Sequence, residues 1–551
     1  MKIKFKRLSK SFLCLLIAIL VLSACTVKTT TPQDSPQATT GDVQGKTDSS
    51  SASSSENTPT KKVEIPEGLE LTWLIRGNAS KWLEDEMYCI EELERRTGIQ
   101  VKFMRMEGDT QAQDDQYKMI LASGKYPDLI MWTHQATYPG GIAKLGEDGV
   151  AIELSKLIEE YMPNYKKILE TKPSIRKEVS TDDGKFYYFS MLNPLESETD
   201  LLKLATTGFV MRKDWLENLG LDVPKNIDEW YEVLTAFKNR DPNNNSQADE
   251  IPYDGTGLEM FAPAFGIRRT YYLDPATKKV KYGPIEPAYK DYLATMNKWY
   301  AEGLIGKNSI TPNSKVTDSN ITSDLAGSFK GLDNAWDKYL PTLREKNPNA
   351  DFVAVPWPAT KDGIVYTDRT ELISHINKET TIITSSCKYP EVAATLIDYM
   401  YSDEGSFLLS WGVEGVNFDY VDGKPQFREY DGETDSLAHY VRPHWALPKY
   451  GYVEAHLAGF SPIRAEADRV WSKVSSDLII HPSISFTAEE NSKILDYNES
   501  IGSYISDMFA KFVTGEEPLS NFDAYVQTVK KRNVDEIIQI YQNALDRFNA
   551  R

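Results

Sequence analysis

From residue 63 onward, the chain alternates between short apolar strands and amphipathic helices. Apolar residues at every second position predict a strand over residues 69–75, and strands are also predicted around Val101 and over residues 128–132. Helices are predicted over residues 80–96 and 111–122, each followed by a glycine where a helix C-cap favours one. The alternation predicts an α/β fold with a doubly wound, mainly parallel sheet and right-handed crossovers.

Polar and aromatic residues follow the predicted strands. Ligands of doubly wound sheets bind beyond the carboxyl ends of the strands. Arg76, Asn78, Trp132 and His134 lie at these ends and are predicted to bind the ligand. The rest of the chain is longer than one such lobe needs, and it is helix-rich, with an amphipathic helix predicted over residues 533–548.

The first 62 residues predict a signal peptide and a tether. Residues 2–10 are basic, residues 12–22 are apolar, and a helix over that apolar run is too short to cross a bilayer. The sequence Leu22-Ser23-Ala24-Cys25 resembles the lipobox of bacterial lipoproteins, which implies a signal peptide over residues 1–24 and a lipid on Cys25. The alternative is an ordinary secretory signal in which this cysteine has no role.

Residues 26–62 are rich in Ser, Thr, Pro and Gln and contain no aromatic residue. Such a segment cannot bury enough apolar area to offset its ordering entropy. Together with Cys25, it is predicted to tether the body to the extracytoplasmic face of the cell membrane.

Composition narrows the possible functions of the body. The chain has 551 residues, a net charge of −19 and 4 cysteines. An acidic surface without a basic run outside the leader repels phosphate backbones, so nucleic-acid binding is not expected. Only Cys89 and Cys387 lie beyond Cys25, too few for a disulfide framework or a structural zinc site.

Three sequence blocks carry a family resemblance. Residues 209–220 read FVMRKDWLENLG, residues 389–418 contain YPE, YSDEG and GVNF, and residues 514–519 read TGEEPL. Together with the lipobox they resemble extracellular solute-binding proteins (family 1) of ABC sugar importers, in the lipoprotein subgroup related to alginate-oligosaccharide binders.

The resemblance implies two discontinuous α/β lobes joined by a hinge, with a periplasmic-binding-protein-like fold and the ligand in the cleft. The expected boundaries are 63–205 plus 366–430 for lobe 1 and 206–365 plus 431–551 for lobe 2. It also implies a monomer that captures an oligosaccharide by lobe closure and delivers it to the permease of an ABC transporter.

One acidic and amide-rich loop predicts a structural calcium site. Oxygen-bearing side chains alternate along it, and calcium takes six to eight oxygen ligands. The predicted ligands are Asp241, Asn243, Asn245, Gln247 (through its carbonyl), Asp249 and Glu250. The loop resembles the EF-hand-like loop of the alginate-binder subgroup, although Ser246 replaces the usual glycine and the last carboxylate comes two positions early. An Asn-rich surface turn is the alternative.

The remaining ligand-binding candidates are aromatic and polar clusters in loops. Sugar rings stack on aromatic faces, and polar side chains bind their hydroxyls. On this ground, and by resemblance for the second-lobe loop, the candidates are Trp132, Asn334, Trp336, Arg442, His444 and Trp445. Trp215, Trp230, Trp299 and Trp411 follow helical periodicity and are expected in the core. Arg268 is a candidate for holding a uronate carboxylate, or it belongs to a solvated pair with Arg269.

The sequence contains no recognisable catalytic motif. No G-x-S-x-G, H-E-x-x-H, C-x-x-C or phosphate loop is present. A secreted glycan-active enzyme needs two carboxylates across a cleft, and no spacing singles out such a pair. The prediction is therefore a binding protein and not an enzyme, with a secreted glycan-active enzyme or a surface receptor for a peptide or another solute as the alternatives.

Overall fold

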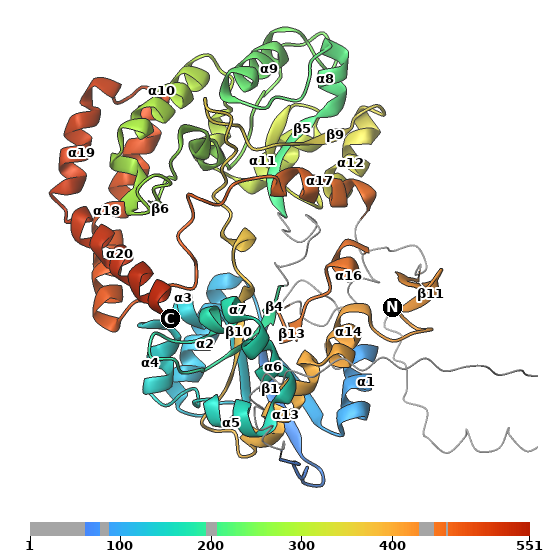
Figure 1. Ribbon diagram of the computed structural model, residues 1–551. Helices are drawn as coiled ribbons and strands as arrows, with labels where there is room; N and C mark the ends of the chain where they lie inside the picture. The colour runs from blue at the N-terminus through green and yellow to red at the C-terminus, as the bar shows by residue number, and fades with distance from the viewer. Residues whose placement is uncertain (1–60, 78–86, 194–205, 429–445, 459–460) are drawn as a thin grey trace, which may run out of the picture. The chain divides into compact units, whose positions relative to one another are not determined.

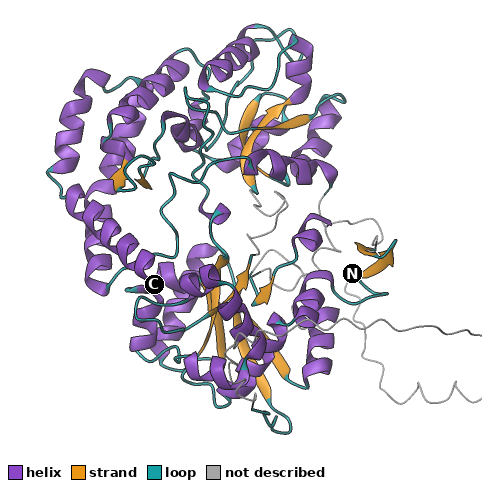
Figure 2. Cartoon of the chain, viewed as in Figure 1, coloured by secondary structure: helices purple, strands orange, loops and turns teal. Residues whose placement is uncertain are grey.

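The computed structural model describes residues 61–77, 87–193, 206–428, 446–458 and 461–551 (Figure 1). These residues form two α/β lobes, each built around its own β-sheet (Figure 2). Lobe 1 comprises the described residues of 61–193 and 374–458, and lobe 2 those of 206–373 and 461–551. The predicted two-lobed α/β fold with discontinuous lobes is confirmed.

Lobe 1 contains a six-stranded mixed sheet in the order β13-β4-β10-β3-β1-β2. β1 is parallel to β2 and β3, β4 is parallel to β13, and β10 runs antiparallel to both β3 and β4. The sheet is therefore less uniformly parallel than the sequence predicts. The strands are β1 (Glu70–Arg76), β2 (Gln100–Met106), β3 (Leu129–Trp132), β4 (Phe189–Leu192), β10 (Ile376–Ile383) and β13 (Lys449–Tyr450).

Helices cover this sheet and enclose one hydrophobic core. α1 and α2 end as predicted, because Gly98 and Gly124 adopt left-handed conformations with φ of 72° and 63°. The helices are α1 (Tyr88–Thr97), α2 (Thr110–Ser123), α3 (His134–Thr137), α4 (Gly141–Glu147), α5 (Ser155–Tyr161), α6 (Pro163–Thr171), α7 (Pro173–Val179), α13 (Pro390–Tyr401), α14 (Asp403–Trp411) and α16 (Val453–Ala458). A hairpin of β11 (Phe418–Val421) and β12 (Lys424–Phe427) follows α14.

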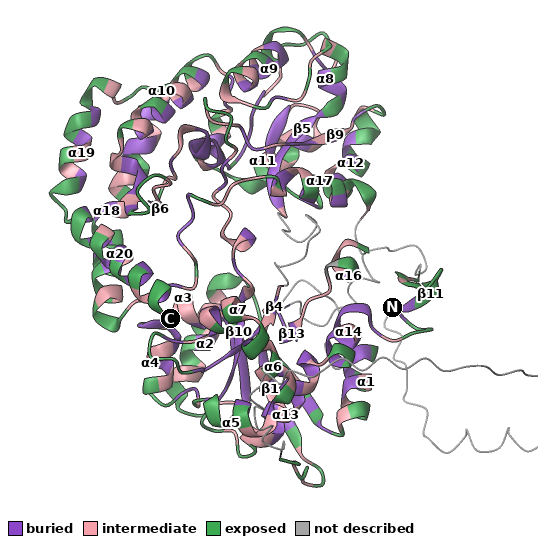
Figure 3. Ribbon diagram, viewed as in Figure 1, coloured by how far each residue is buried: buried purple, intermediate pink, exposed green. Residues whose placement is uncertain are grey.

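Lobe 2 is centred on a three-stranded antiparallel sheet in the order β8-β5-β9. Side chains of successive strand residues point to opposite faces, so Phe209 and Met211 of β5 enter one core and Val210 enters another. Every residue of β5 is buried (Figure 3). The strands are β5 (Thr207–Arg212), β8 (Ser328–Leu332) and β9 (Phe352–Val355), with a separate hairpin of β6 (Tyr271–Leu273) and β7 (Val280–Tyr282).

The helices of lobe 2 come from both ends of its sequence. They are α8 (Lys213–Leu219), α9 (Ile227–Asn239), α10 (Pro287–Ala301), α11 (Ser314–Thr322), α12 (Ala335–Lys346), α17 (Pro462–Ser472), α18 (Ala488–Thr514), α19 (Phe522–Lys530) and α20 (Val534–Ala550); the short 3-10 helices are η3 (Leu258–Phe265), η4 (Gly283–Ile285), η5 (Lys307–Ser309), η6 (Thr370–Leu372) and η7 (Leu519–Asn521). α20 places Ile537, Ile540 and Phe548 in the same core as Phe209. Trp215, Trp230, Trp299 and Trp411 are buried, as expected.

The second and third crossovers between the lobes lie later in the sequence than expected. Tyr366 still pairs with Ser475 of lobe 2, and the chain enters lobe 1 only between Leu372 and Ile376. Lys449 and Tyr450 pair with β4 and complete the lobe 1 sheet, so the chain still belongs to lobe 1 at β13, beyond the expected boundary near Glu429. A two-residue strand gives too weak a pattern to be recognised from the sequence.

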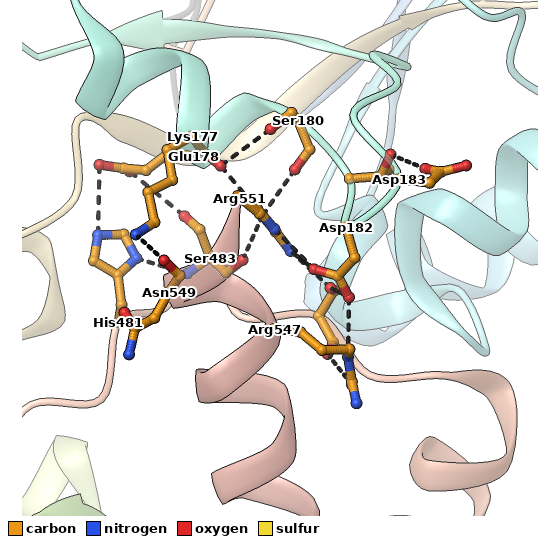
Figure 4. A network of polar contacts seen from close by, with 12 residues as sticks. Lys177, Glu178, Ser180, Asp182, Asp183, His481, Ser483, Arg547, Asn549 and Arg551 are labelled. Carbon is orange, nitrogen blue, oxygen red and sulfur yellow. Dashed lines mark hydrogen bonds and ion pairs between the residues drawn. The ribbon is translucent and has the colours of Figure 1, made fainter. Parts of the chain in front are cut away.

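One buried carboxylate, that of Glu178 on α7, connects lobe 1 to two segments that lead into lobe 2 (Figure 4). The Glu178 side chain is 2% exposed, and its Oε1 atom lies 2.5 Å from Nδ1 of His375 and 3.4 Å from Nε2 of His481. Ser374 donates a hydrogen bond of 2.9 Å to the same carboxylate. Burial alone would raise the pKa of Glu178, but the hydrogen bonds from His375 and His481 outweigh it and lower the pKa to about 2.

Arginines at the end of α20 form a second connection beside the first (Figure 4). The Arg551 guanidinium donates to the backbone carbonyls of Ser180 (2.8 Å) and Ser483 (3.2 Å). It also pairs with Asp182 at 2.7 Å, and Arg547 pairs with the same carboxylate at 3.1 Å. The loop after α7 in lobe 1 is therefore held by the last helix of lobe 2.

Substituting Glu178 should change stability in a pH-dependent way. Because the folded-state pKa lies below the ordinary value, the stabilisation is fully present above about pH 4.5 and is lost as the pH falls towards 2. Urea unfolding of Glu178→Gln should show a loss of roughly 3 kcal/mol near pH 6 that shrinks steadily below pH 4.5. The control is Asp183→Asn, which changes an exposed carboxylate in the loop after α7. It should lower the free energy of unfolding by less than about 0.5 kcal/mol. A deficit for Glu178→Gln that is equal at pH 6 and pH 3 would contradict this assignment.

Candidate functional site

A cavity of about 780 Å³ lies between the lobe 1 sheet and the segments that lead into lobe 2. Lobe 1 lines it with residues in or beside β4, β10 and β13 and with residues of α3, α4, α7, α14 and α16. The opposite side is formed by Thr206, residues 369–371, Pro482, Ser483, Ser485 and Arg551. No residue of β3 lines the cavity; the residues after this strand that do so are Gln135 and Ala136 of α3.

The cavity wall is partly apolar and carries a few polar side chains. Ile142, Met191, Ile376 and Leu409 supply aliphatic surface, and Tyr188 and Tyr452 supply aromatic rings; Gln135, Asn193, Asn377, Lys378 and Lys449 supply amides and amines. Walls of this kind are typical of pockets that bind small polar ligands, because apolar surface gives affinity and the polar groups give orientation.

The charged residues beside the second crossover, where the chain passes from lobe 2 into lobe 1, are paired with one another. Arg369 and Glu371 form an ion pair of 2.6 Å, with side chains 25% and 37% exposed. Glu178, whose carboxylate is held by two histidines, also lines the cavity. The second crossover therefore presents a neutral ion pair to the cavity and is fixed to lobe 1 by the neighbouring residues Ser374 and His375.

Two of the predicted ligand-binding residues, Trp132 and His134, lie in the core of lobe 1, and the side chain of a third, Arg76, is 26% exposed. Trp132 is 2% exposed and stacks on Tyr117 at 5.5 Å, and Arg76 lies over the Trp132 ring and pairs with Glu379 at 2.7 Å. His134 is fully buried and bonds to the Tyr117 hydroxyl at 2.7 Å, and burial lowers its pKa to about 4. None of these three lines the cavity, whereas the next residue, Gln135, does.

The predicted stacking residue of lobe 2 is also buried in this structure. Trp336 is 3% exposed, donates from Nε1 to the Phe352 carbonyl at 3.1 Å and contacts Trp471. In this structure the Trp336 indole is therefore enclosed and does not line the cavity. Asn334 precedes α12 and makes no side-chain capping bond.

Arg268 lies beside the second crossover and not in the cavity wall. Its Nη2 atom donates to the Asp368 carbonyl at 3.0 Å, and burial lowers its pKa. Asn78, Arg442, His444, Trp445 and the lipidation candidate Cys25 lie outside the described residues.

Sequence reasoning missed the cavity residues on the crossovers. Glu178, Arg369 and Glu371 lie in ordinary polar stretches, and nothing in their spacing distinguishes them. Asn377 lies on a strand whose antiparallel placement beside β3 depends on a crossover that the sequence does not locate.

The predicted calcium loop adopts a compact, strained turn. Asp241, Asn244 and Ser246 have left-handed conformations, and the Asp241 carboxylate accepts hydrogen bonds from the backbone amides of Asn245 (3.0 Å) and Ser246 (2.9 Å). Oε1 of Glu250 is buried without a hydrogen-bond partner, and burial followed by the charges of Asp249 and Asp241 raises its pKa.

The described part of the chain contains neither a cluster of metal-binding side chains nor a helix that could span a membrane. No group of three or more His, Cys, Asp or Glu side chains is arranged there to hold a metal, so a cation in this loop would depend on amide and backbone oxygens as well. Within the same residues, no helix combines the length and the apolar character needed to cross a bilayer.

Comparison with known proteins agrees with this architecture. The fructooligosaccharide ABC transporter substrate-binding protein FusA of Streptococcus pneumoniae serotype 4 is 27% identical over 499 residues, covering 85% of this chain and 88% of FusA. FusA in complex with kestose superimposes with a TM-score of 0.69 at 22% identity, covering 88% of this chain and 100% of the FusA chain. A further FusA structure is of an EF-hand mutant in complex with fructo-nystose.

The alginate-binding protein AlgQ2, solved without calcium ion, superimposes with a TM-score of 0.66 at 22% identity and covers 86% of this chain and 98% of its own. At these identities the structural likeness establishes the fold. Residues 84–406, more than half of the chain, match the sequence profile described as bacterial extracellular solute-binding protein. The chain therefore belongs to the bacterial extracellular solute-binding protein family, and it is a binding protein and not an enzyme, as predicted.

Proposed function

We propose that this protein captures an oligosaccharide in the cavity between its lobes and delivers it to the permease of an ABC transporter. The observation that carries the proposal is the cavity itself, because one ligand in it would contact lobe 1 and the crossover segments together. Its volume of about 780 Å³ suits a molecule of a few sugar rings. FusA, the relative described above, is named for binding fructooligosaccharides.

Closure of the lobes follows from where the ligand contacts lie. A ligand that bonds to Asn377 of lobe 1 and to Arg369 or Thr370 of the crossover stabilises the arrangement in which both are within reach. The equilibrium then shifts towards that arrangement by the difference in ligand affinity between the two states. A single chain contains both sides of the cavity, so a monomer suffices.

Thermal unfolding with a ligand panel tests the proposal. The panel contains the neutral trisaccharides kestose, maltotriose and xylotriose, the acidic trisaccharide trigalacturonate, and tripeptides. A ligand at 1,000 times its Kd adds about 4 kcal/mol, so a true ligand should raise the melting temperature by several degrees. Asn377→Ala and Arg369→Ala should reduce that rise, and Lys167→Ala, an exposed residue on α6, should not.

Saturable binding of a sugar without any product would support a carbohydrate importer. A response only to peptides would overturn the carbohydrate assignment and favour a peptide receptor.

We also propose that Cys25 carries a lipid and anchors the protein at the extracytoplasmic face of the membrane. The lipobox sequence at residues 22–25 and the polar tether after it support this proposal. Cys25→Ser should release the protein from the membrane fraction into the medium, as measured by fractionation and immunoblotting. Retention of this variant in the membrane fraction would contradict lipid anchoring.

The third proposal is a structural calcium ion in the loop of residues 241–250. The partnerless Glu250 oxygen fits it, because a cation beside it would offset the charges that raise the Glu250 pKa. Asp241, Asn243, Asn245, Asp249 and Glu250 would hold the ion through side-chain oxygens, and Gln247 would do so through its carbonyl.

Calcium removal tests this loop separately from sugar binding. Millimolar Ca²⁺ should give a higher melting temperature than EDTA does. At a Ca²⁺ concentration of 100 times the Kd, binding adds about 2.7 kcal/mol to the free energy of unfolding. Asp241→Asn should abolish the rise, and Asp222→Asn, an exposed aspartate outside the loop, should leave it intact. An equal response of the Asp241→Asn variant and the unmodified protein would contradict the assignment.

A further inference from the structure

Asp468, on α17 of lobe 2, is buried without any hydrogen-bond partner. Its exposure is 2%, and it is the only side chain among the described residues in which both carboxylate oxygens are buried and unpartnered. Burying a polar group without a partner costs free energy, and a carboxylate is among the most expensive groups to bury. The position therefore destabilises the ligand-free protein, and a hydrogen-bond donor that reached the carboxylate would offset this cost.

Two charged residues, Arg464 and Asp333, lie close to Asp468. Arg464, one turn earlier on α17, pairs with Asp333 at 3.3 Å and with the exposed Asp337 at 3.6 Å. Burial raises the pKa of Asp468 to about 8, with a further contribution from the charge of Asp333, and burial also raises the pKa of Asp333. Arg464 thus pairs with two carboxylates, and it acts on Asp468 only through its charge, because Asp468 receives no hydrogen bond from it.

This group lies next to the cavity wall. The backbone amide of Asp333 donates a 3.0 Å hydrogen bond to the carbonyl of Thr206, which lines the cavity. Leu372, next to the cavity residue Glu371, packs in the same hydrophobic cluster as Ala467 and Trp471 of α17. The Arg464 and Asp333 side chains are 16% and 10% exposed and Asp468 is 2% exposed, so Arg464 and Asp333 are the more accessible part of the group.

We propose that Asp333, Arg464 and Asp468 form the lobe 2 contact site for the ligand, and that a hydroxyl pair of a neutral sugar entering beside Arg464 supplies the missing partner of Asp468. The inference rests on the proposed sugar-binding function and makes it more specific. A uronate would bring a further negative charge to carboxyl groups that already share one cation, so the site selects neutral sugars against acidic ones.

The burial of Asp468 also predicts a proton linkage. Near neutral pH the carboxyl is largely protonated in the free protein, because its pKa is raised. Hydroxyl groups that donate to the carboxylate stabilise its ionised form, so sugar binding should release about one proton per ligand at pH 7. A purely structural role for Asp468 gives no such release.

Titration calorimetry of the full protein at pH 7, in phosphate and in Tris, tests the inference. The probes are kestose, maltotriose, xylotriose and trigalacturonate. For the neutral trisaccharide that binds, Asp468→Asn should weaken affinity by roughly 10- to 100-fold and abolish proton release, since a hydrogen bond to a charged group is lost. Asp337→Asn, which alters an exposed carboxylate beside the same arginine, should change affinity by less than about twofold.

The outcomes separate the inference from the proposed function. The ligand-free melting temperature of Asp468→Asn should equal or exceed that of the unmodified protein, because an unpartnered carboxyl has been removed. If a neutral sugar binds but Asp468→Asn has unchanged affinity and proton release, the inference is overturned and the proposed function stands. Binding of trigalacturonate and of no neutral sugar also overturns the inference. If no sugar binds the unmodified protein, the proposed function is overturned, and the inference with it.

Discussion

The carboxylate of Glu178 is the contact on which the relation between the lobes depends. It receives bonds from a serine and two histidines that lie about 200 and 300 residues further along the chain. Because the side chain is almost fully buried, each of these bonds is made in a poorly screened environment and cannot be replaced by water. The arrangement holds the second crossover and the segment before α18 against lobe 1, directly at the cavity. A movement of lobe 2 that displaces His481 must therefore break or rearrange its contact with Glu178.

Much of lobe 1 could be predicted from local patterns. The strands and helices up to β3 occur where alternation and periodicity indicate them, and Gly98 ends α1 for the expected conformational reason. These elements are long enough, and regular enough, to be recognised without knowledge of their neighbours. The same reasoning identified α20 from its amphipathic pattern. By contrast, β13 has two residues, and its place in the sheet is decided by pairing with β4.

The candidate site was harder to predict than the fold because it depends on which residues the crossovers bring together. Aromatic composition suggested Trp132 and Trp336, but both indoles belong to hydrophobic cores, that of Trp132 in lobe 1 and that of Trp336 in lobe 2. The polar residues of the cavity come from segments far apart in the sequence, and their types are common on any surface. Asp468 illustrates the difficulty, since an aspartate between Ala467 and Arg469 on a helix gives no sign that its carboxyl is enclosed.

The contribution of α20 to the core of lobe 2 has a consequence for biosynthesis. Phe209 enters the chain more than 300 residues before Phe548, yet the two belong to one hydrophobic cluster. During synthesis, the part of this cluster that α20 completes therefore stays uncovered until almost the whole polypeptide has been made. A chain that must cross a membrane unfolded benefits from such a delay, whereas premature burial would obstruct its passage. The same delay leaves the emerging lobe exposed to proteases and to aggregation, so release and folding of the final helix have to follow each other closely.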